Sequence, residues 1–285
     1  MVAIANTLRR KGITKFNTTK LLYRFTHLQK CIEGQETVYL VYTLGKVGSQ
    51  TIYITLREKI LESDVFHLHF VSDSWFNNPN KILSKKPEAI KIAQKVRSIV
   101  SSNKKIKIIS LVRDPIAKTI SQIFQTPEAF GFTEIELLKM KPKDICHVLT
   151  HQAKSHFHHP SQWFEQEFLD FTGLDIYRTP FEYSCRKQTD KFKMFEFLIL
   201  RNEDLQFEKQ IINNLQKFIG KPIDNLIVGN KTNDKITGGI YKKVKNQISF
   251  NNDFLNEIYS SKYCQHFYSK IEIEDFKKRW IFKNK

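Results

Sequence analysis

Short apolar runs and helical stretches alternate along the chain from Thr37 onward. Four runs rich in β-branched and aromatic residues indicate buried strands. They are Val38–Tyr42, Val65–Phe70, Ile106–Val112 and Phe195–Leu200. Helices are expected at residues 49–61, 81–102 and 115–125. Strands that alternate with helices are typical of a parallel sheet. The pattern therefore predicts an α/β fold, in which a P-loop-like parallel β-sheet is flanked by helices and followed by a mostly helical C-terminal part.

The charge of the chain narrows the choice of partners. Among its 285 residues, 46 Lys and Arg stand against 29 Asp and Glu, which gives a formal net charge of +17. Such a charge indicates an anionic partner: nucleic acid, an anionic membrane, an acidic glycan or a phosphorylated small molecule. A general abundance of Lys is the alternative explanation. Because no nucleic-acid motif is present, no nucleic-acid partner is expected.

Residues 1–36 are predicted to form a basic N-terminal arm, and residues 37–285 a single α/β domain. The first 32 residues contain seven Lys or Arg and no Asp or Glu. We expect this segment to be solvated and to touch an anionic membrane surface; a transit peptide is the third alternative. The four cysteines are widely spaced, and no apolar run reaches the ~18 residues that span a bilayer. The expected location is the cytoplasm, with peripheral contact at the inner membrane face.

A loop with two glycines connects the first predicted strand to the first helix. It comprises Gly45, Lys46, Val47, Gly48, Ser49, Gln50 and Thr51. The backbone N–H groups of such a loop, together with the helix N-terminus, form an anion site. A Walker A loop has its Lys directly before the Ser or Thr that holds Mg²⁺. Here Lys46 precedes Gly48, so no metal is expected. A structural glycine turn is the alternative.

A second candidate site lies at the end of the third predicted strand. Arg113 is followed by Asp114 and Pro115, and proline suits the first turn of a helix. Ser121 lies two turns along that helix. An arginine fork with a hydroxyl can hold a phosphate monoester. In the alternative interpretation, Arg113 only pairs with Asp114 at the helix start.

Together, these two motifs resemble those of the sulfotransferases that depend on 3′-phosphoadenosine 5′-phosphosulfate (PAPS). In that family a 5′-phosphosulfate loop follows the first strand, and an Arg with a Ser eight residues later binds the 3′-phosphate. The segment Leu200–Leu205 is similar to the family's R-x-E-D-L segment. Residues 267–269 and Trp280 resemble bacterial putative capsular polysaccharide synthesis proteins of the same superfamily. The resemblance implies the sulfotransferase fold, PAPS as donor, 3′-phosphoadenosine 5′-phosphate (PAP) as product, and no required metal.

Two histidines on the second predicted strand are candidates for acid–base chemistry. His67 and His69 share one face, because side chains alternate along a strand. An imidazole is suited to take a proton from a sugar hydroxyl. Uronyl 2-O-sulfotransferases carry a similar H-x-H strand, and this resemblance implies that His69 is the base. We place His69, Lys46 and His67 in the catalytic set; in the alternative interpretation the histidines belong to the core.

Further basic and histidine-rich segments surround these motifs. Lys231 and Tyr241 lie in a Gly- and Lys-rich segment that is expected to close over the nucleotide or to be an ordinary loop. Histidines crowd residues 147–159, where His147 and His151 have helical spacing. They lack the Glu of a zinc motif, so an acceptor-groove or surface role is expected.

The predicted function is transfer of the sulfuryl group from PAPS to a hydroxyl of a glycan, which is expected to be acidic. The resemblance points to the biosynthesis of a bacterial capsule or surface polysaccharide. Two alternatives remain: a P-loop-type kinase or other nucleotide-dependent transferase, and a non-catalytic basic protein that binds membrane or nucleic acid. A kinase would need a Mg²⁺-binding carboxylate at a strand end.

Overall fold

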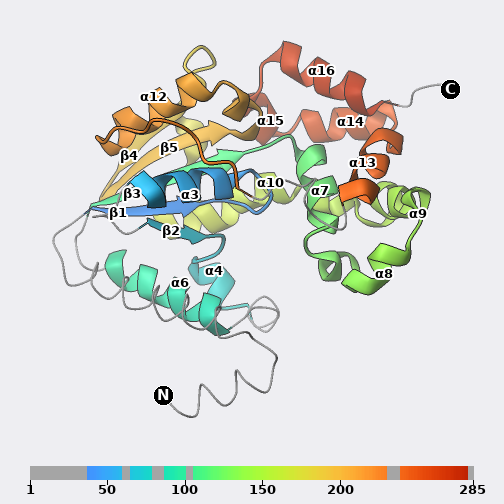
Figure 1. The fold of residues 1–285 in the computed structure, drawn as a ribbon, viewed down its shortest axis with the longest axis horizontal. Coiled ribbons are helices and arrows are strands. Elements are labelled where there is room, and N and C mark those ends of the chain that lie inside the picture. The colour runs from blue at the N-terminus through green and yellow to red at the C-terminus, as the bar shows by residue number, and fades with distance from the viewer. Residues whose placement is uncertain (1–36, 60–64, 79–86, 101–104, 230–237, 282–285) are drawn as a thin grey trace.

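A five-stranded sheet forms the centre of the protein. The computed structural model describes residues 37–59, 65–78, 87–100, 105–229 and 238–281. The strands are β1 (Val38–Tyr42), β2 (Val65–Leu68), β3 (Ile106–Val112), β4 (Gln188–Phe192) and β5 (Phe195–Arg201). Their order in the sheet is β2-β1-β3-β5-β4 (Figure 1). β2, β1, β3 and β5 run parallel to one another, and β4 is antiparallel to β5. The predicted α/β fold with a mostly parallel sheet is therefore confirmed.

The central strands are apolar because both of their faces are covered. All five residues of β1 are buried, and so are six of the seven residues of β3. Parallel strands covered on both faces have such continuous apolar sequences. The strand β4 was not predicted, because the sequence Gln188–Phe192 is mostly polar and lies at the sheet edge.

The helices that connect the strands follow the predicted pattern, with corrected ends. They are α3 (Ser49–Lys59), α4 (Asp73–Phe76), α6 (Pro87–Val100) and α7 (Pro115–Ile123), while α12 (Glu208–Ile219) follows the last strand. The first and third predicted helices correspond to α3 and α7, and α7 ends two residues earlier than predicted. The ends of the predicted 81–102 helix lie partly outside the described residues.

The part of the chain after β5 is mostly helical, as predicted. It contains α13 (Gly238–Gln247), α14 (Asn252–Tyr259), α15 (Lys262–Phe267) and α16 (Lys270–Trp280). Between α7 and β4 lie α8 (Glu134–Lys139), α9 (Pro142–His147), α10 (His159–Gln162), α11 (Leu169–Thr172) and short 3-10 and π turns. Figure 1 shows α7, α13 and α14 beyond the carboxyl ends of β1 and β3, the strands that the two predicted anion-binding motifs follow. The apolar core extends from Val38 to Trp280.

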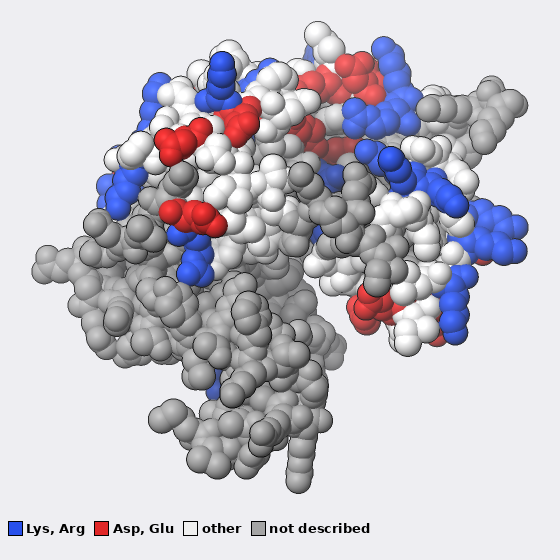
Figure 2. All heavy atoms as spheres, in the orientation of Figure 1, with Lys and Arg blue, Asp and Glu red and all other residues white. Residues whose placement is uncertain are grey.

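Lys and Arg side chains lie on several parts of the described surface (Figure 2). Figure 2 shows Lys and Arg side chains over α9, α13 and α16, with acidic residues among them. Exposed examples are Lys143, Lys242, Lys243, Lys245, Lys278 and Arg279. None of the described helices is long and apolar enough to cross a membrane. The predicted basic arm, residues 1–36, lies outside the described residues.

Candidate functional site

The loop after β1 has a backbone conformation that favours anion binding. Lys46 and Gly48 both adopt left-handed conformations, with φ of 69° and 83°. A Cβ on Gly48 would lie 2.3 Å from Asn202 Nδ2 and 3.0 Å from Leu205 Cδ1, so only glycine fits without displacing a neighbour. The loop leads directly into α3, whose N-terminus carries partial positive charge. The predicted transition from strand through loop to helix is confirmed.

Side chains from two other strand ends hold the carbonyl groups of this loop. Arg113 Nη1 donates to the carbonyl oxygen of Lys46 at 2.9 Å, and Asn202 Nδ2 donates to that of Val47 at 3.2 Å. Lys46 Nζ donates to Gln125 Oε1 at 2.8 Å. Two carbonyl oxygens that would repel a phosphate are therefore occupied by donors. This arrangement leaves the backbone N–H groups of the loop to face an anion.

The second predicted anion site lies at the end of β3, next to the loop. The hydroxyl of Tyr263 accepts from the backbone N–H of Arg113 and donates to the Arg113 carbonyl, both at 2.9 Å. Pro115 occupies the first turn of α7, as predicted, and Ser121 is a buried residue of the same helix. The Arg113 side chain thus starts from a fixed backbone and reaches the loop.

Asp114 has a structural role at the start of α7. Its carboxylate accepts hydrogen bonds from the Ile116 N–H at 3.0 Å, the Tyr259 hydroxyl at 2.8 Å and the Trp280 indole at 2.9 Å. Burial raises the pKa of Asp114, while these three donors lower it. The carboxylate is therefore occupied by donors from α7, α14 and α16. This arrangement differs from the alternative interpretation, in which Arg113 serves only as its partner.

Glu203 links the end of β5 to the end of β3. Its Oε1 accepts from the Asp114 N–H at 2.9 Å, and its Oε2 accepts from the Tyr268 hydroxyl at 3.2 Å. Burial raises the pKa of Glu203 to about 7, and the nearby Asp114 carboxylate adds to this effect. Because both of its oxygens are engaged, Glu203 supports the site in this geometry.

The tautomer of His69 is set by its surroundings. His69 follows β2, which ends at Leu68, two residues earlier than predicted. Its Nδ1 lies 2.6 Å from the Thr43 carbonyl oxygen. A carbonyl can only accept, so Nδ1 carries the proton and Nε2 is the nitrogen with the basic lone pair. The Trp163 indole donates to the His69 carbonyl at 2.8 Å and so fixes its backbone.

His67 is held by residues of the phosphate-binding loop. Its Nε2 lies 2.9 Å from Ser49 Oγ, and its Nδ1 lies 3.1 Å from Gln50 Nε2. Its ring stacks on Tyr53, with ring centroids 5.4 Å apart, and meets His69 edge-on at 4.8 Å. The two imidazoles are thus neighbours, and His67 contacts Ser49 and Gln50 directly.

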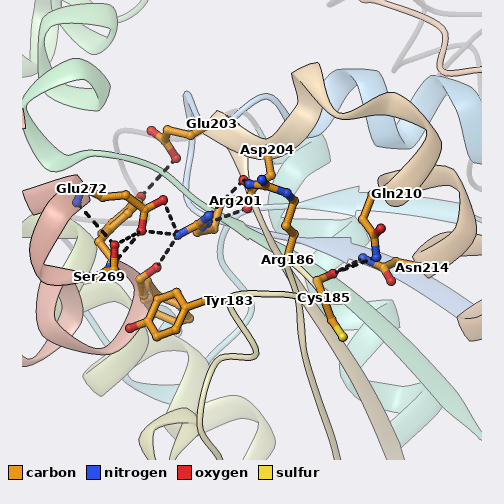
Figure 3. Close-up of polar contacts among 12 residues, drawn as sticks. Tyr183, Cys185, Arg186, Arg201, Glu203, Asp204, Gln210, Asn214, Ser269 and Glu272 are labelled. Carbon is orange, nitrogen blue, oxygen red and sulfur yellow. Dashed lines mark hydrogen bonds and ion pairs between the residues drawn. The ribbon is translucent and has the colours of Figure 1, made fainter. Parts of the chain in front are cut away.

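A buried arginine joins the R-x-E-D-L segment to the C-terminal helices. Arg201 donates to both oxygens of Asp204 at 2.5 and 2.9 Å, to Glu272 at 3.0 Å and to the Phe267 carbonyl at 3.0 Å. Its side chain is 2% exposed. Figure 3 shows Arg201 between Asp204 on one side and Glu272 on the other. Arg186 also pairs with Asp204, at 2.6 Å.

A buried lysine, which the sequence analysis did not single out, lies on α7. Lys118 is 1% exposed; its Nζ donates to Gln122 Oε1 at 2.5 Å and lies 3.3 Å from His159 Nδ1. Burial lowers the pKa of Lys118 to about 7. Among the described residues, no Asp or Glu forms an ion pair with Lys118.

The remaining predicted residues have more varied positions. Thr51 is buried in α3, and a Cβ added to Gly45 would have no heavy atom within 4 Å. Tyr241 lies on α13 and meets Phe124 edge-on, with ring centroids 5.6 Å apart. Lys231 lies outside the described residues. His147 and His151 stack at 4.3 Å, and the described residues contain no group of three or more His, Cys, Asp or Glu that could hold a metal.

The sheet, the loop after β1 and the arginine beside it define an α/β protein with a candidate anion-binding site. A comparison with protein families matches residues 26–283 to the sulfotransferase domain. The chain therefore belongs to the sulfotransferase family, whose members generally take the sulfuryl group from PAPS. No curated protein and no solved structure matched the chain.

Proposed function

We propose that this enzyme transfers the sulfuryl group of PAPS to a hydroxyl of a glycan. The observation that carries the proposal is the contact between its two anion-binding motifs. Arg113 Nη1 donates to the Lys46 carbonyl at 2.9 Å, so the residues that we propose for the 3′-phosphate and for the 5′-phosphosulfate lie next to one another, as one nucleotide would need. The family match supports sulfuryl transfer in general.

The donor site combines the loop with the start and middle of α7. Arg113 and Ser121 would hold the 3′-phosphate. Gly45, Val47, Gly48, Ser49, Gln50 and Thr51 would surround the phosphosulfate, with Lys231 and Tyr241 closing over the nucleotide. Lys46 would stabilise the negative charge that grows on the departing 5′-phosphate. PAPS supplies an activated sulfuryl group, and the proposed scheme includes no metal ion.

His69 is the proposed general base. Its Nε2 would take the proton of the acceptor hydroxyl, while the Thr43 carbonyl keeps the proton on Nδ1 and stabilises the imidazolium that forms. His67 would orient Ser49 and Gln50 of the donor loop, which it contacts. In this proposal His69 acts on the acceptor, and His67 positions the donor loop.

The nature of the acceptor rests on sequence resemblance and charge. A glycan with acidic groups suits the net charge of +17 and the exposed lysines of α9 and α13. A role in bacterial capsule or surface polysaccharide synthesis remains a prediction. So do a single domain over residues 37–285, a cytoplasmic location, and membrane contact through residues 1–32.

Nucleotide binding tests the donor assignment. PAP at a hundredfold excess over its dissociation constant should stabilise the fold by about 2.7 kcal/mol, and Arg113→Ala should remove most of this effect. The measurement is the shift in unfolding temperature with PAP, ADP and ATP. Equal stabilisation by ADP, which lacks the 3′-phosphate, would contradict the assignment. Stronger stabilisation by ATP with Mg²⁺ would favour a kinase.

A further inference from the structure

The two halves of the donor site both depend on the residues that follow β5. The loop follows β1, and Arg113 follows β3, which lies between β1 and β5 in the sheet. Val112 is level with Arg201 in the parallel register, so Arg113 and Asn202 leave the sheet at the same height. From there Asn202 reaches past β3 to the loop after β1.

Adjacent residues of this segment contact different halves of the site. Asn202 Nδ2 donates to the Val47 carbonyl at 3.2 Å, on the phosphosulfate side. Glu203 Oε1 accepts from the Asp114 N–H at 2.9 Å, directly after Arg113 on the 3′-phosphate side. One peptide unit therefore connects the two groups that bind opposite ends of the nucleotide.

Contacts of the flanking residues fix the position of the segment Asn202–Glu203. Arg201 precedes it and Asp204 follows it, and their buried ion pair closes the turn at 2.5 Å (Figure 3). Arg201 also binds the Phe267 carbonyl and Glu272 on the C-terminal helices. Leu205 Cδ1 lies 3.0 Å from where a Cβ of Gly48 would be. The segment cannot shift without disturbing contacts on both sides.

We propose that Asn202 and Glu203 are positioning residues that fix the spacing between the donor loop and Arg113. The inference rests on the proposed function, because it assigns the two sides to two ends of one nucleotide. A ligand that bridges both sides gains affinity only when their spacing is correct. A ligand that occupies one side alone does not depend on that spacing. The role should therefore be visible as a difference between bridging and half ligands.

The experiment compares three nucleotides by isothermal titration calorimetry. PAP carries both phosphates, adenosine 5′-monophosphate only the 5′-phosphate and adenosine 3′-monophosphate only the 3′-phosphate. Asn202→Ala removes the amide donor without adding a charge and should weaken PAP about tenfold, the loss expected for one hydrogen bond and its geometry. Each monophosphate should weaken by less than about threefold.

Two further variants test whether the effect belongs to this segment. Glu203→Ala should resemble Asn202→Ala, whereas Glu203→Gln keeps an oxygen for the Asp114 N–H and should retain PAP affinity within about threefold. Asn214→Ala is the matched control. Asn214 lies on α12, and its Nδ2 donates the same kind of hydrogen bond, at 2.8 Å, to the Cys185 carbonyl. The control variant should leave PAP affinity unchanged even if it lowers the unfolding temperature.

The possible outcomes distinguish failure of the positioning role from failure of the proposed function. Selective loss of PAP affinity in Asn202→Ala and Glu203→Ala supports the positioning role. Equal losses for PAP and for one monophosphate overturn it, because the residue then acts on one half only. Unchanged PAP binding in both variants also overturns it. If the wild-type protein binds no PAP, the proposed function fails, and this inference fails with it.

Discussion

Gly48 offers the sharpest test of the donor-loop geometry. Alanine at this position would meet two penalties. The left-handed backbone costs an L-residue about 1–2 kcal/mol. The new Cβ would also lie 2.3 Å from Asn202 Nδ2, so Asn202 must move and give up its bond to Val47, at a cost of about 0.5–1.5 kcal/mol. Gly48→Ala should therefore destabilise the fold by about 2–3 kcal/mol.

Two other glycines separate the penalties. Gly220 has φ of 77° but no atom within 4 Å of a Cβ, so Gly220→Ala should show the backbone cost alone. Gly45 has neither a left-handed φ nor a neighbour within 4 Å. Gly45→Ala should thus be neutral, or stabilise by about 0.4–1 kcal/mol through the unfolded chain. The free energy of unfolding in urea measures all three variants under one set of conditions.

The order of the three variants in unfolding free energy tests the geometry of the loop. If Gly48→Ala and Gly220→Ala cost the same, Asn202 is not fixed against the loop, and the contact argument is refuted. If Gly48→Ala is as stable as Gly45→Ala, the loop does not keep its left-handed residue in solution. Either result would remove the structural basis for a preformed anion site.

Three further predictions concern histidine, lysine and arginine side chains. His69→Ala should lower the rate of sulfuryl transfer by about 10²–10⁴-fold and erase an ascending limb of the pH–rate profile, whereas His67→Ala should leave that limb. The unfolding free energy of the wild type should rise between about pH 7 and 9, because Lys118 of the unfolded chain binds a proton that the buried amine has released; above about pH 9 the raised pKa values of the Cys146 and Cys264 thiols oppose this rise. Lys118→Met should abolish the rise and stabilise the protein at neutral pH. Arg201→Met should cost about 3–5 kcal/mol, as measured by urea unfolding, because the buried Asp204 carboxylate then keeps only Arg186, among the described residues, as an ion-pair partner. Lys277→Met removes an exposed ion pair and should cost less than about 1 kcal/mol; equal losses for these two variants would contradict the buried-network argument.

The strands at the centre of the sheet could be predicted because burial on both faces leaves a continuous apolar signal. β1 and β3 agree with the predicted ranges residue for residue. The edge strand β4 has the sequence Gln188–Phe192, with polar side chains that do not distinguish it from a loop. Its place in the sheet depends on antiparallel pairing with β5, a tertiary interaction.

The positions of the loop and of Arg113 at strand ends could be predicted because each has a local sequence signature; their roles in binding the donor stay predictions. Asn202 could not, because its partner Val47 lies 155 residues earlier and an asparagine carries no signal of such a contact. Lys118 was also missed, since its sequence context resembles that of an exposed helix residue. The tautomer of His69 depends on the Thr43 carbonyl, which only the fold brings within 2.6 Å.

The bond between Trp280 and Asp114 has a consequence for biosynthesis. It joins residues 166 positions apart, and the Tyr259 hydroxyl, which shares this carboxylate, comes from 145 positions away. A ribosome produces β1, β3 and α7 well before it produces either aromatic residue, and chains begin to fold from their N-terminal parts during synthesis. Until then, the Asp114 carboxylate lacks two of its donors and stays hydrated. The nascent chain would therefore acquire its nucleotide site late, after most of its sheet has formed.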